Sequence, residues 1–186
     1  MEVRPLKSAD VSKLADIDAT IDSVEYLHIA RIGEGFALQF TLEVRPLRER
    51  AIEPNTTSDE ITFLARQIGS GADEGLALVA EHEHQIVGLL LAQAHARRST
   101  LQIHDIRIDH DFRRQGLASA LIFQAIQFAR DHELRAVSMK TRTNNLPAAR
   151  LLQKCGFEIA GLDTQHQSNH DLVKESVTIF WYAALD

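Results

Sequence analysis

The sequence has little of what several classes of protein depend on. A single cysteine among 186 residues excludes an intramolecular disulfide and any metal site built from several cysteines. No apolar run approaches the length of about 20 residues that a membrane span needs. No basic-then-apolar leader follows Met1, so we expect no secretory signal. Lys and Arg number 20 against 26 Asp and Glu, and a net charge of −6 argues against a nucleic-acid-binding surface. These absences favour a cytoplasmic protein.

The rest of the composition is ordinary for a globular chain. Hydrophobic residues make up 45% of the sequence and charged residues 25%. A chain of this length can bury most of its apolar surface as one domain. There is no internal repeat, low-complexity tract or linker. We therefore expect a single domain over residues 1–186.

Residues 101–129 are the most informative stretch, and they begin with a strand. The apolar residues of this strand occupy odd positions at first and even positions later, so one extra residue must be absorbed between them. This predicts a β-bulge at His104 and Asp105. A strand buried on both faces with no bulge is the alternative. The apolar residues concerned are Leu101, Ile103, Ile106 and Ile108.

A basic, glycine-containing loop and a long helix follow the strand. Loop residues 109–115 end in Arg113 and Arg114 (followed by Gln115), and Gly116 opens the helix. The first turn of a helix has backbone N–H groups without partners and carries partial positive charge. With two arginines beside it, this turn forms an anion site suited to a pyrophosphate. Glycine at 116 leaves room for close approach of the phosphates. The apolar stripe that follows comprises Leu117, Ala118, Leu121, Ile122, Ala125, Ile126, Phe128 and Ala129.

Two motifs together resemble the GNAT superfamily of acyl-CoA-dependent N-acyltransferases. Residues 113–118, Arg-Arg-Gln-Gly-Leu-Ala, are similar to its Arg/Gln-x-x-Gly-x-Gly/Ala motif. Residues 144–157, which contain Asn145 and end in Gly156-Phe157, are similar to its Asn-x-x-Ala…Gly-Phe signature. This second segment and the Trp181-Tyr182 tail also resemble the streptothricin acetyltransferase branch. The likeness is good from about Leu76 onward and loose over the first fifty residues.

The resemblance implies a fold and a donor. The fold would be α/β (α+β), a mixed and mostly antiparallel sheet of about seven strands, with a bulged, splayed strand at the cofactor cleft and helices on both faces. The donor would be acetyl-CoA, with its pantetheine arm paired to the edge of the splayed strand. Asn145 would contact that arm, although a turn or N-cap role before Pro147 is the alternative. The implied cofactor-binding residues are Ile106, Arg107, Ile108, Arg113, Arg114, Gln115, Gly116, Leu117, Ala118, Ser119 and Asn145.

The sequence supports the catalytic residues less strongly than the cofactor-binding residues. Relatives often carry a glutamate near the bulge as general base, and His104 or Asp105 could take that role here; a neutral histidine accepts a proton readily near pH 7. The alternative is that both are only polar residues at an irregular strand. Relatives often place a tyrosine at the position of Leu152 as general acid, so that role cannot be carried over. We interpret Cys155 as a core residue and expect no metal site among the nine histidines.

The other segments agree with this fold in order. We expect strands at 3–5, 76–81, 86–94, 136–140, 157–160 and 176–183, and helices starting after a Ser8 cap, from Ser58 to Ile68, and from Pro147 to Lys154.

Two segments depart from the generic fold. Residues 24–45 alternate apolar and polar from Phe36 to Val44, which predicts a β-hairpin with one buried face; an amphipathic helix is the alternative. Residues 46–57 look like a loop, and we interpret Arg45, Arg48 and Arg50 as a solvated face. We expect the acceptor pocket between residues 22–50 and the polar segment 163–174.

The sequence thus favours an acetyl-CoA-dependent N-acetyltransferase that acts on a primary amine of a small molecule, including an antibiotic, or of a protein. A non-catalytic acetyl-CoA-binding domain acting as a sensor or scaffold is the alternative, which the missing tyrosine at Leu152 favours. A doubly wound nucleotide-binding domain fails because the glycine-started helix follows a hairpin and not a first strand. We expect neither nucleic acid nor membrane as a partner, and a homodimer stays open.

Overall fold

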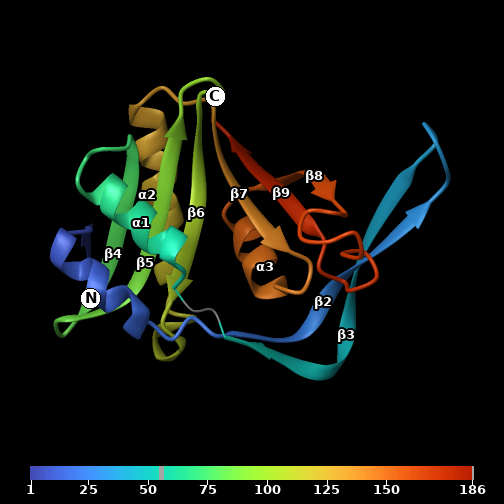
Figure 1. Ribbon diagram of the computed structural model, residues 1–186, viewed down its shortest axis with the longest axis horizontal. Helices are drawn as coiled ribbons and strands as arrows, with labels where there is room; N and C mark the ends of the chain where they lie inside the picture. Colours follow the sequence, from blue (N-terminus) through green and yellow to red (C-terminus); the bar gives the residue numbers. More distant parts are fainter. Residues whose placement is uncertain (55–56, 186) are drawn as a thin grey trace.

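The computed structural model describes residues 1–54 and 57–185 (Figure 1). Over these residues a seven-stranded sheet has the order β1-β4-β5-β6-β7-β9-β8, and β2 and β3 form a separate two-stranded hairpin. All neighbouring strands are antiparallel except β6 and β7, which are parallel. This confirms the mixed, mostly antiparallel sheet. The strands are β1 (Glu2–Pro5), β2 (Ile21–Ile32), β3 (Gln39–Glu53), β4 (Gly75–His82), β5 (Gln85–His95), β6 (Thr100–Ile108), β7 (Ala136–Arg142), β8 (Glu158–Asp163) and β9 (Thr178–Ala184).

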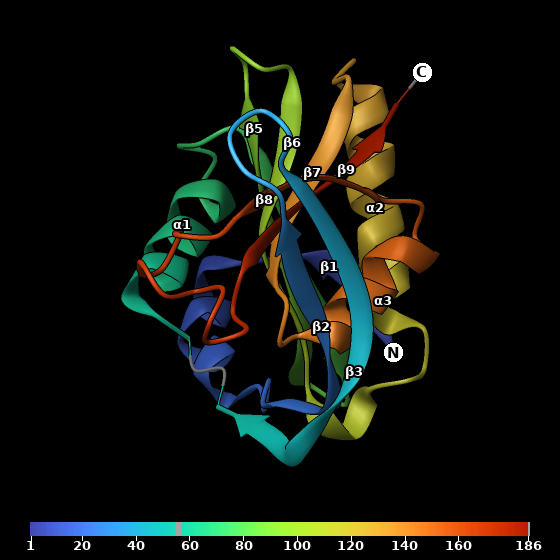
Figure 2. The same ribbon diagram turned by 90° about the vertical axis from the view of Figure 1, so that its right-hand side faces the viewer.

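Helices cover both faces of the sheet, as expected. Helices α2 and α3 pack on one face in the larger hydrophobic core, while η1 and α1 pack on the other face against β4 and β5 (Figures 1 and 2). On this second face η1 and α1 lie over β4 and β5, whereas β7 and β9 contribute Lys140, Arg142, Phe180 and Tyr182 there, with the Lys140 ammonium 5.3 Å from the centre of the Phe180 ring. No helix of the described residues has the length and apolar character to span a bilayer. The helices are η1 (Ser8–Asp16), α1 (Asp59–Gly69), η2 (His110–Phe112), α2 (Leu117–Asp131) and α3 (Leu146–Lys154).

Local signals explain where the helices begin. The Ser58 side chain accepts the Ile61 N–H at 3.2 Å, so the predicted cap of α1 is confirmed. The first helix differs from its prediction, because Ser8 lies inside a 3₁₀ segment. Its start is held by the Asp10 carboxylate, which accepts the Lys7 N–H at 2.8 Å.

The hairpin predicted at 24–45 is present and longer than expected, since β3 continues to Glu53. The prediction that one face is buried was wrong for β3, which has no fully buried residue, and Phe36 at the turn is completely exposed. The reason is visible in Figure 1, where the hairpin tip projects away from the sheet. The loop predicted from residue 46 was also wrong up to Glu53; Asn55 and Thr56 lie outside the described residues.

Candidate active site

The predicted bulge is confirmed in β6. Leu91 of β5 pairs with Asp105 and the next residue, Ala92, pairs with Ile103, so His104 is the extra residue. The bulge reverses the strand's parity: Leu101, Ile103 and Ile108 all pack in the core beneath α2.

The splay of β6 from β7 begins at the bulge. The two strands pair only from Thr100–Ile103 to Ala136–Met139. Beyond Ile103, none of the described strands pairs with β6 on its β7 side, although β5 stays paired on the other. One edge of residues 104–108 is therefore left to hydrogen bond with something other than the sheet.

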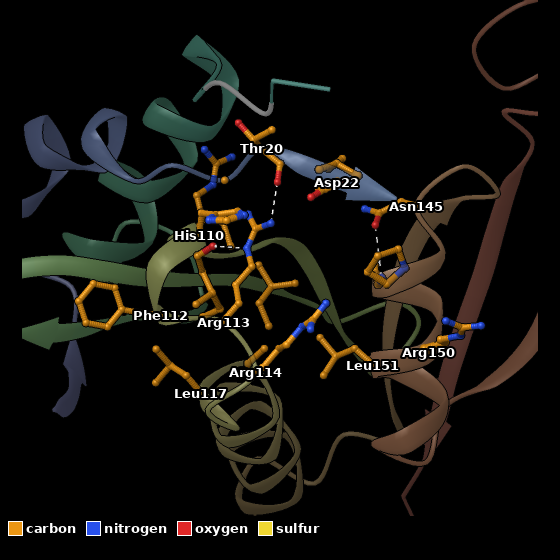
Figure 3. Close-up of a pocket in the computed structure, with 18 of the residues that line it drawn as sticks. Thr20, Asp22, His110, Phe112, Arg113, Arg114, Leu117, Asn145, Arg150 and Leu151 are labelled. Atoms are coloured by element: carbon orange, nitrogen blue, oxygen red, sulfur yellow. Dashed lines mark hydrogen bonds between the residues drawn. The ribbon is translucent and has the colours of Figure 1, made fainter. Parts of the chain in front are cut away.

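A cavity of about 790 Å³ lies at this splayed edge (Figure 3). It contains every predicted cofactor-binding residue except Gln115, and it contains neither His104 nor Asp105. Its lining residues are Ala19, Thr20, Ile21, Asp22, Arg50, Ile106, Arg107, Ile108, His110, Phe112, Arg113, Arg114, Gly116, Leu117, Ala118, Ser119, Asn145, Pro147, Ala148, Arg150, Leu151 and Lys154.

The first turn of α2 faces this cavity. Gly116 caps the helix with a φ of 82°, in the left-handed region that favours glycine. A Cβ built there meets nothing within 4 Å, so the space above Gly116 is open. The unpaired N–H groups of the turn are thus accessible to an anion.

The two arginines before Gly116 differ in role. The Arg113 guanidinium donates to the carbonyl oxygens of Ile108 at 3.1 Å, Thr20 at 2.7 Å and Asp18 at 3.3 Å. It therefore ties the loop to the start of β2, a contact that no local sequence pattern predicts. Arg114, by contrast, extends from the start of α2 toward Leu151 in Figure 3. Its charge is the one directed across the cavity.

Three further cations line the cavity and were missed as ligand residues. Arg50 lies on β3 and is paired with Asp22 (Nε to Oδ1, 2.6 Å), so the interpretation of Arg50 as only a solvated face was incomplete. Arg150 and Lys154 come from α3, four residues apart on one helix face. Pro147, Arg150 and Lys154 follow one another at intervals of three and four residues, so the sequence could have shown that they share a helix face. Together the three cations make the cavity suited to an anionic ligand.

Asn145 has the N-cap role considered for it, while its contact with the cofactor arm stays a prediction. Its Oδ1 accepts the Ala148 N–H at 3.3 Å and so caps α3. Its side chain also lines the cavity, and its Nδ2 is the atom left to face a ligand.

Asp105 is committed to another residue. Its side chain is not part of the cavity lining, and its Oδ2 accepts from Arg107 Nε at 2.6 Å. Both residues are almost fully buried, and Arg107 also donates to Thr57 Oγ1 at 2.8 Å. Burial raises the pKa of Asp105, against the lowering effect of Arg107. A carboxylate held in a buried ion pair is a poor candidate for a base that must reach substrate.

His104 is the more accessible of the two catalytic candidates. Its ring has an exposed edge and lies 6.2 Å, centroid to centroid, from that of His95. Partial burial lowers the pKa of His104, and the His95 charge lowers it further. The neutral form that can accept a proton is therefore favoured near pH 7.

Of the other residues considered for acid chemistry, all but Tyr182 are buried or hydrogen-bonded elsewhere. Leu152 is fully buried beneath the sheet. Tyr26 donates its hydroxyl to Glu175 Oε1 at 2.7 Å, and this bond raises the pKa of Tyr26. Tyr182 is half-buried on β9. Cys155 lies in the core, where burial raises the pKa of its thiol. Among the described residues no three His, Cys, Asp or Glu side chains converge as metal ligands.

Comparisons with known proteins agree with this architecture. The model of the Acetyltransferase (GNAT) family matches residues 40–157. A Streptothricin acetyltransferase of Escherichia coli is 34% identical over 80 residues, 43% of this chain and 46% of that protein. N-acetyltransferase 8 of Homo sapiens is 38% identical over 87 residues, 45% of this chain and 38% of that protein. The chain spans less than half the length of these relatives.

Two solved structures match over the whole chain. One is a protein described as a streptothricin acetyltransferase of Bacillus anthracis str. Ames in complex with acetyl coenzyme A; the TM-score is 0.79 at 22% identity, covering 100% of this chain and 97% of that one. The other is Nourseothricin acetyltransferase, with a TM-score of 0.79 at 18% identity, covering 100% and 98%. At these identities the likeness is one of fold. Since the family model covers more than half of the sequence, this chain belongs to the GNAT acetyltransferase family.

Proposed function

We propose that this protein is an acetyl-CoA-dependent N-acetyltransferase that moves an acetyl group to a primary amine of a small molecule or of a protein. The observation that carries the proposal is the unpaired edge of β6 beside a cavity that ends at the start of α2. An extended amide-containing arm and a pyrophosphate need these two features side by side.

The residues of the cavity fit acetyl-CoA. Arg114 and Lys154 supply positive charge to the cavity that opens at the first turn of α2, which matches the phosphates. Arg50 and Arg150 also line it, although each is paired with a carboxylate, Asp22 and Glu25. Apolar side chains on the β6 side of the cavity, such as Ile106, suit the pantetheine chain. Arg113 contributes by holding the loop in place, and Asn145 Nδ2 is available for the arm.

The chemistry asks little of the protein. The amine nitrogen attacks the thioester carbonyl carbon, the C–S bond breaks, the thiolate leaves, and the nitrogen loses a proton. In this proposal a backbone N–H on the open edge of β6 polarises the carbonyl oxygen. We assign the proton to His104, since Asp105 is held by Arg107. The thiolate leaves without help from a general acid. Leu152, which is fully buried and has no proton to donate, cannot act as one.

The names of the relatives suggest the acceptor. Two of them act, by name, on streptothricin, so we propose a small molecule with a primary amine, including an antibiotic, as the first class to test. The expectations of a single domain, a cytoplasmic location and an open choice between monomer and homodimer stay predictions.

One experiment tests the function. Free-thiol release from acetyl-CoA is measured with purified protein against a panel of primary amines, streptothricin-class antibiotics and N-terminal peptides. Release that depends on both the amine and the protein is expected. Tight binding of acetyl-CoA with no release for any amine would instead support the sensor or scaffold, which the lack of an acid at Leu152 favours.

A further inference from the structure

The base of the β2–β3 hairpin crosses the gap between the splayed strands. Its first end is tied beside β6, where Asp18 O accepts the His110 N–H at 2.9 Å. Further along, the Leu27 N–H donates to Thr143 O, at the end of β7, at 2.9 Å. We call residues 20–27 and 46–53 the strap. In Figure 2, β2 and β3 lie in front of the central sheet.

The strap sends different side chains to its two sides. Asp22 and its partner Arg50 line the cofactor cavity. Glu53, which pairs with Ile21, instead places its carboxylate on β7: Oε2 accepts from Arg142 Nη2 at 2.9 Å and Oε1 accepts from Asn144 Nδ2 at 3.0 Å. The strap thus carries an acidic group at the end of β7, beside the cavity that Ile21 lines.

Arg142 shows which face of the sheet Glu53 adjoins. Its neighbour Thr141 accepts from Trp181 Nε1 at 2.8 Å in the core beneath α2 and α3. Side chains alternate along a strand, so Arg142 and Lys140 lie on the opposite face. Lys140 is also close enough to His104 to influence its pKa. Glu53 therefore adjoins the sheet face opposite the α2 and α3 core, the face to which Lys140 also points.

Asn144 holds Glu53 at a cost. Because its Nδ2 donates to Glu53, its Oδ1 is turned away, and that oxygen is buried without a hydrogen-bond partner among the described residues. A buried unpaired acceptor costs more than a partly exposed ion pair contributes to stability. An unpaired buried acceptor calls for an explanation, and it marks Asn144 and its partner Glu53 as candidates for a functional role.

We propose that Glu53 binds the amino group of the acceptor, with Arg142 and Asn144 as the residues that position it. One carboxylate oxygen accepts a bond from Arg142 of β7 and the other accepts one from Asn144, which follows β7, so each has a second lone pair left for an N–H donor. The proposal rests on the proposed function and names the group that holds its second substrate. Since Arg142 offsets the charge of Glu53, the site accepts hydrogen bonds without strongly favouring the protonated amine, which cannot attack.

Glu53→Gln tests the proposal, with Glu49→Gln, an exposed residue on the same strand, as the matched control. In thiol-release assays KM for the amine should rise about tenfold or more in Glu53→Gln, because a charged hydrogen-bond acceptor is lost. KM for acetyl-CoA should change by less than about twofold, and Glu49→Gln should match the parent. An unchanged amine KM, or a rise in the acetyl-CoA KM alone, would overturn it.

Two further variants separate amine binding at Glu53 from a structural role and from binding at a neighbouring carboxylate. Asn144→Ala removes the orphaned oxygen, so its melting temperature should be no lower than that of the parent while the amine KM rises; a lower melting temperature with normal kinetics would show a structural role only. Glu175→Gln tests the carboxylate that Tyr26 and His28 hold on the adjoining loop. If that variant alone raises the amine KM, the assignment to Glu53 is wrong.

A binding measurement keeps this proposal separate from the proposed function. The ¹³C signal of the Glu53 carboxylate is followed while lysinamide is titrated into the parent protein. A shift at Glu53 and none at Glu49 is expected. A shift at Glu53 with no thiol release for any amine of the panel would refute catalysis and leave the binding site standing. Thiol release from lysinamide without a shift would refute the binding site alone.

Discussion

At the scale of single residues, backbone conformation decides what position 116 tolerates. Gly116 has a φ of 82° and Gly156, after α3, has a φ of 85°. In both cases an added Cβ would meet nothing within 4 Å. The two glycines thus carry the same backbone requirement, but only Gly116 faces the cavity. Substitutions at the two glycines therefore distinguish the cost of backbone strain, which both share, from an effect on ligand binding, which only Gly116 should show.

We expect Gly116→Ala and Gly156→Ala each to lower the free energy of unfolding by about 1–2 kcal/mol, the cost of a left-handed side chain. Gly116→Asp should in addition weaken acetyl-CoA binding roughly tenfold to a hundredfold, because its carboxylate meets the phosphates. Calorimetric titration measures the affinity, and Gly156→Ala should bind normally. Equal affinity in Gly116→Asp and the parent would show that the phosphates bind elsewhere.

His104 carries the second prediction at this scale. Its lowered pKa means that the neutral form predominates above a midpoint below 6.5, so kcat should rise with pH through that midpoint and then stay level. No alkaline fall is expected, since Leu152 cannot act as an acid. His104→Ala should remove the rise and lower kcat roughly a hundredfold or more.

The pH dependence of kcat for parent and variant checks this assignment. If the rise persists unchanged in His104→Ala, the ionisation belongs to another group. A bell-shaped profile whose alkaline limb disappears in Tyr182→Phe or Tyr26→Phe would identify a relocated acid.

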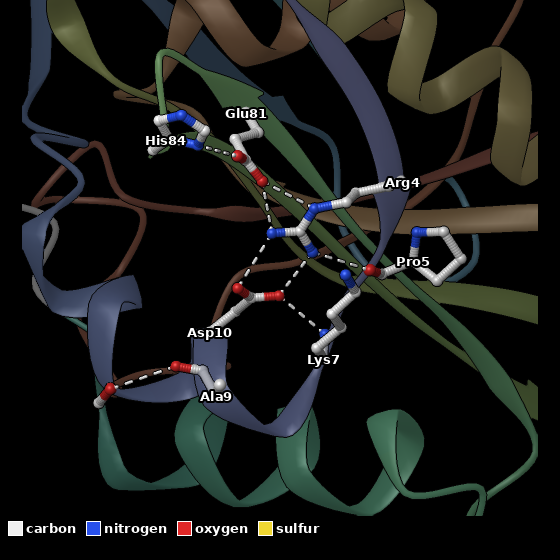
Figure 4. A network of polar contacts seen from close by, with 8 residues as sticks. Arg4, Pro5, Lys7, Ala9, Asp10, Glu81 and His84 are labelled. Carbon is white, nitrogen blue, oxygen red and sulfur yellow. Dashed lines mark hydrogen bonds and ion pairs between the residues drawn. The ribbon is translucent and has the colours of Figure 1, made fainter.

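At the scale of elements, a single arginine joins three of them (Figure 4). Arg4 of β1 contacts Asp10 of η1 at 2.7 Å (Nη1 to Oδ2) and Glu81 of β4 at 2.6 Å (Nη2 to Oε2). Asp10 is almost fully buried. Arg4 donates to both carboxylates and lowers the pKa of Asp10 and of Glu81, and its bond to Asp10 raises the pKa of Arg4. This network holds η1 against the edge of the sheet.

Acid should weaken this network. Since the folded-state pKa of Asp10 is below its unfolded value of 3.8, its contribution to stability is present above that value and is lost as pH falls through the folded-state pKa. Asp10→Asn should therefore destabilise the protein most at neutral pH, and the difference from the parent should shrink toward pH 3. Urea unfolding across this pH range measures it. Asp16→Asn, on the exposed side of η1, is the control, and a pH-independent difference would contradict the prediction.

The Thr143 hydroxyl links the segment after β7 to the segment before β9, beside a backbone bond from the Thr143 N–H to Val177 O at 3.0 Å. Thr143 is fully buried, and its Oγ1 donates to Glu175 O at 2.7 Å and accepts the Val177 N–H at 3.0 Å. Thr178, one residue further on, is equally buried, but its hydroxyl has no partner among the described residues. The same substitution at the two positions thus removes a used hydroxyl in one case and an unused one in the other.

We expect Thr143→Val to lower the free energy of unfolding by about 1–3 kcal/mol, because the Val177 N–H is left unpaired. Thr178→Val should be neutral or stabilising. Denaturant unfolding followed by the fluorescence of Trp181, the single and buried tryptophan, compares the two. A larger loss in Thr178→Val than in Thr143→Val would show that these hydrogen bonds are assigned wrongly.

At the scale of the whole molecule, the projecting hairpin is the outlying part (Figure 1). Beyond the strap it presents large apolar side chains to solvent, among them Phe36 and Val44. Such side chains bury almost nothing within this chain, so they contribute little to its stability as a monomer. They are also the surface on which a homodimer would be expected to depend.

Replacing Phe36 and Val44 together by serine should change the free energy of unfolding by no more than about 0.5 kcal/mol for each residue in a monomer. Analytical ultracentrifugation of parent and variant tests the homodimer, which stays a prediction. Conversion of a dimer to a monomer would place the contact on the hairpin. A large loss of stability in a protein that is monomeric in both forms would contradict the exposed position of these side chains.

The sequence by itself determined the features that depend on neighbouring residues. The parity change around His104 predicted the bulge, and the stripe after Gly116 predicted α2, because alternation and helical periodicity are local. Ser58 and Asn145 each cap a helix by accepting the N–H of the residue three positions later, which is also a local pattern. For the same reason the anion site at the start of α2 was readable, and almost all of the predicted cofactor residues line one cavity.

The tertiary structure alone decided which side chains meet across the chain. Glu53 contacts Arg142 and Asn144, which are 89 and 91 residues away, and Arg113 contacts backbone more than 90 residues away. No periodicity relates such positions, because the path of the strap over the splayed strands brings them together. The burial that pairs Asp105 with Arg107, and the projection that leaves β3 exposed, likewise follow from packing of distant segments. The local sequence pattern thus determined the anion-binding loop before α2, whereas the packing of distant elements determined which charged and polar side chains surround it.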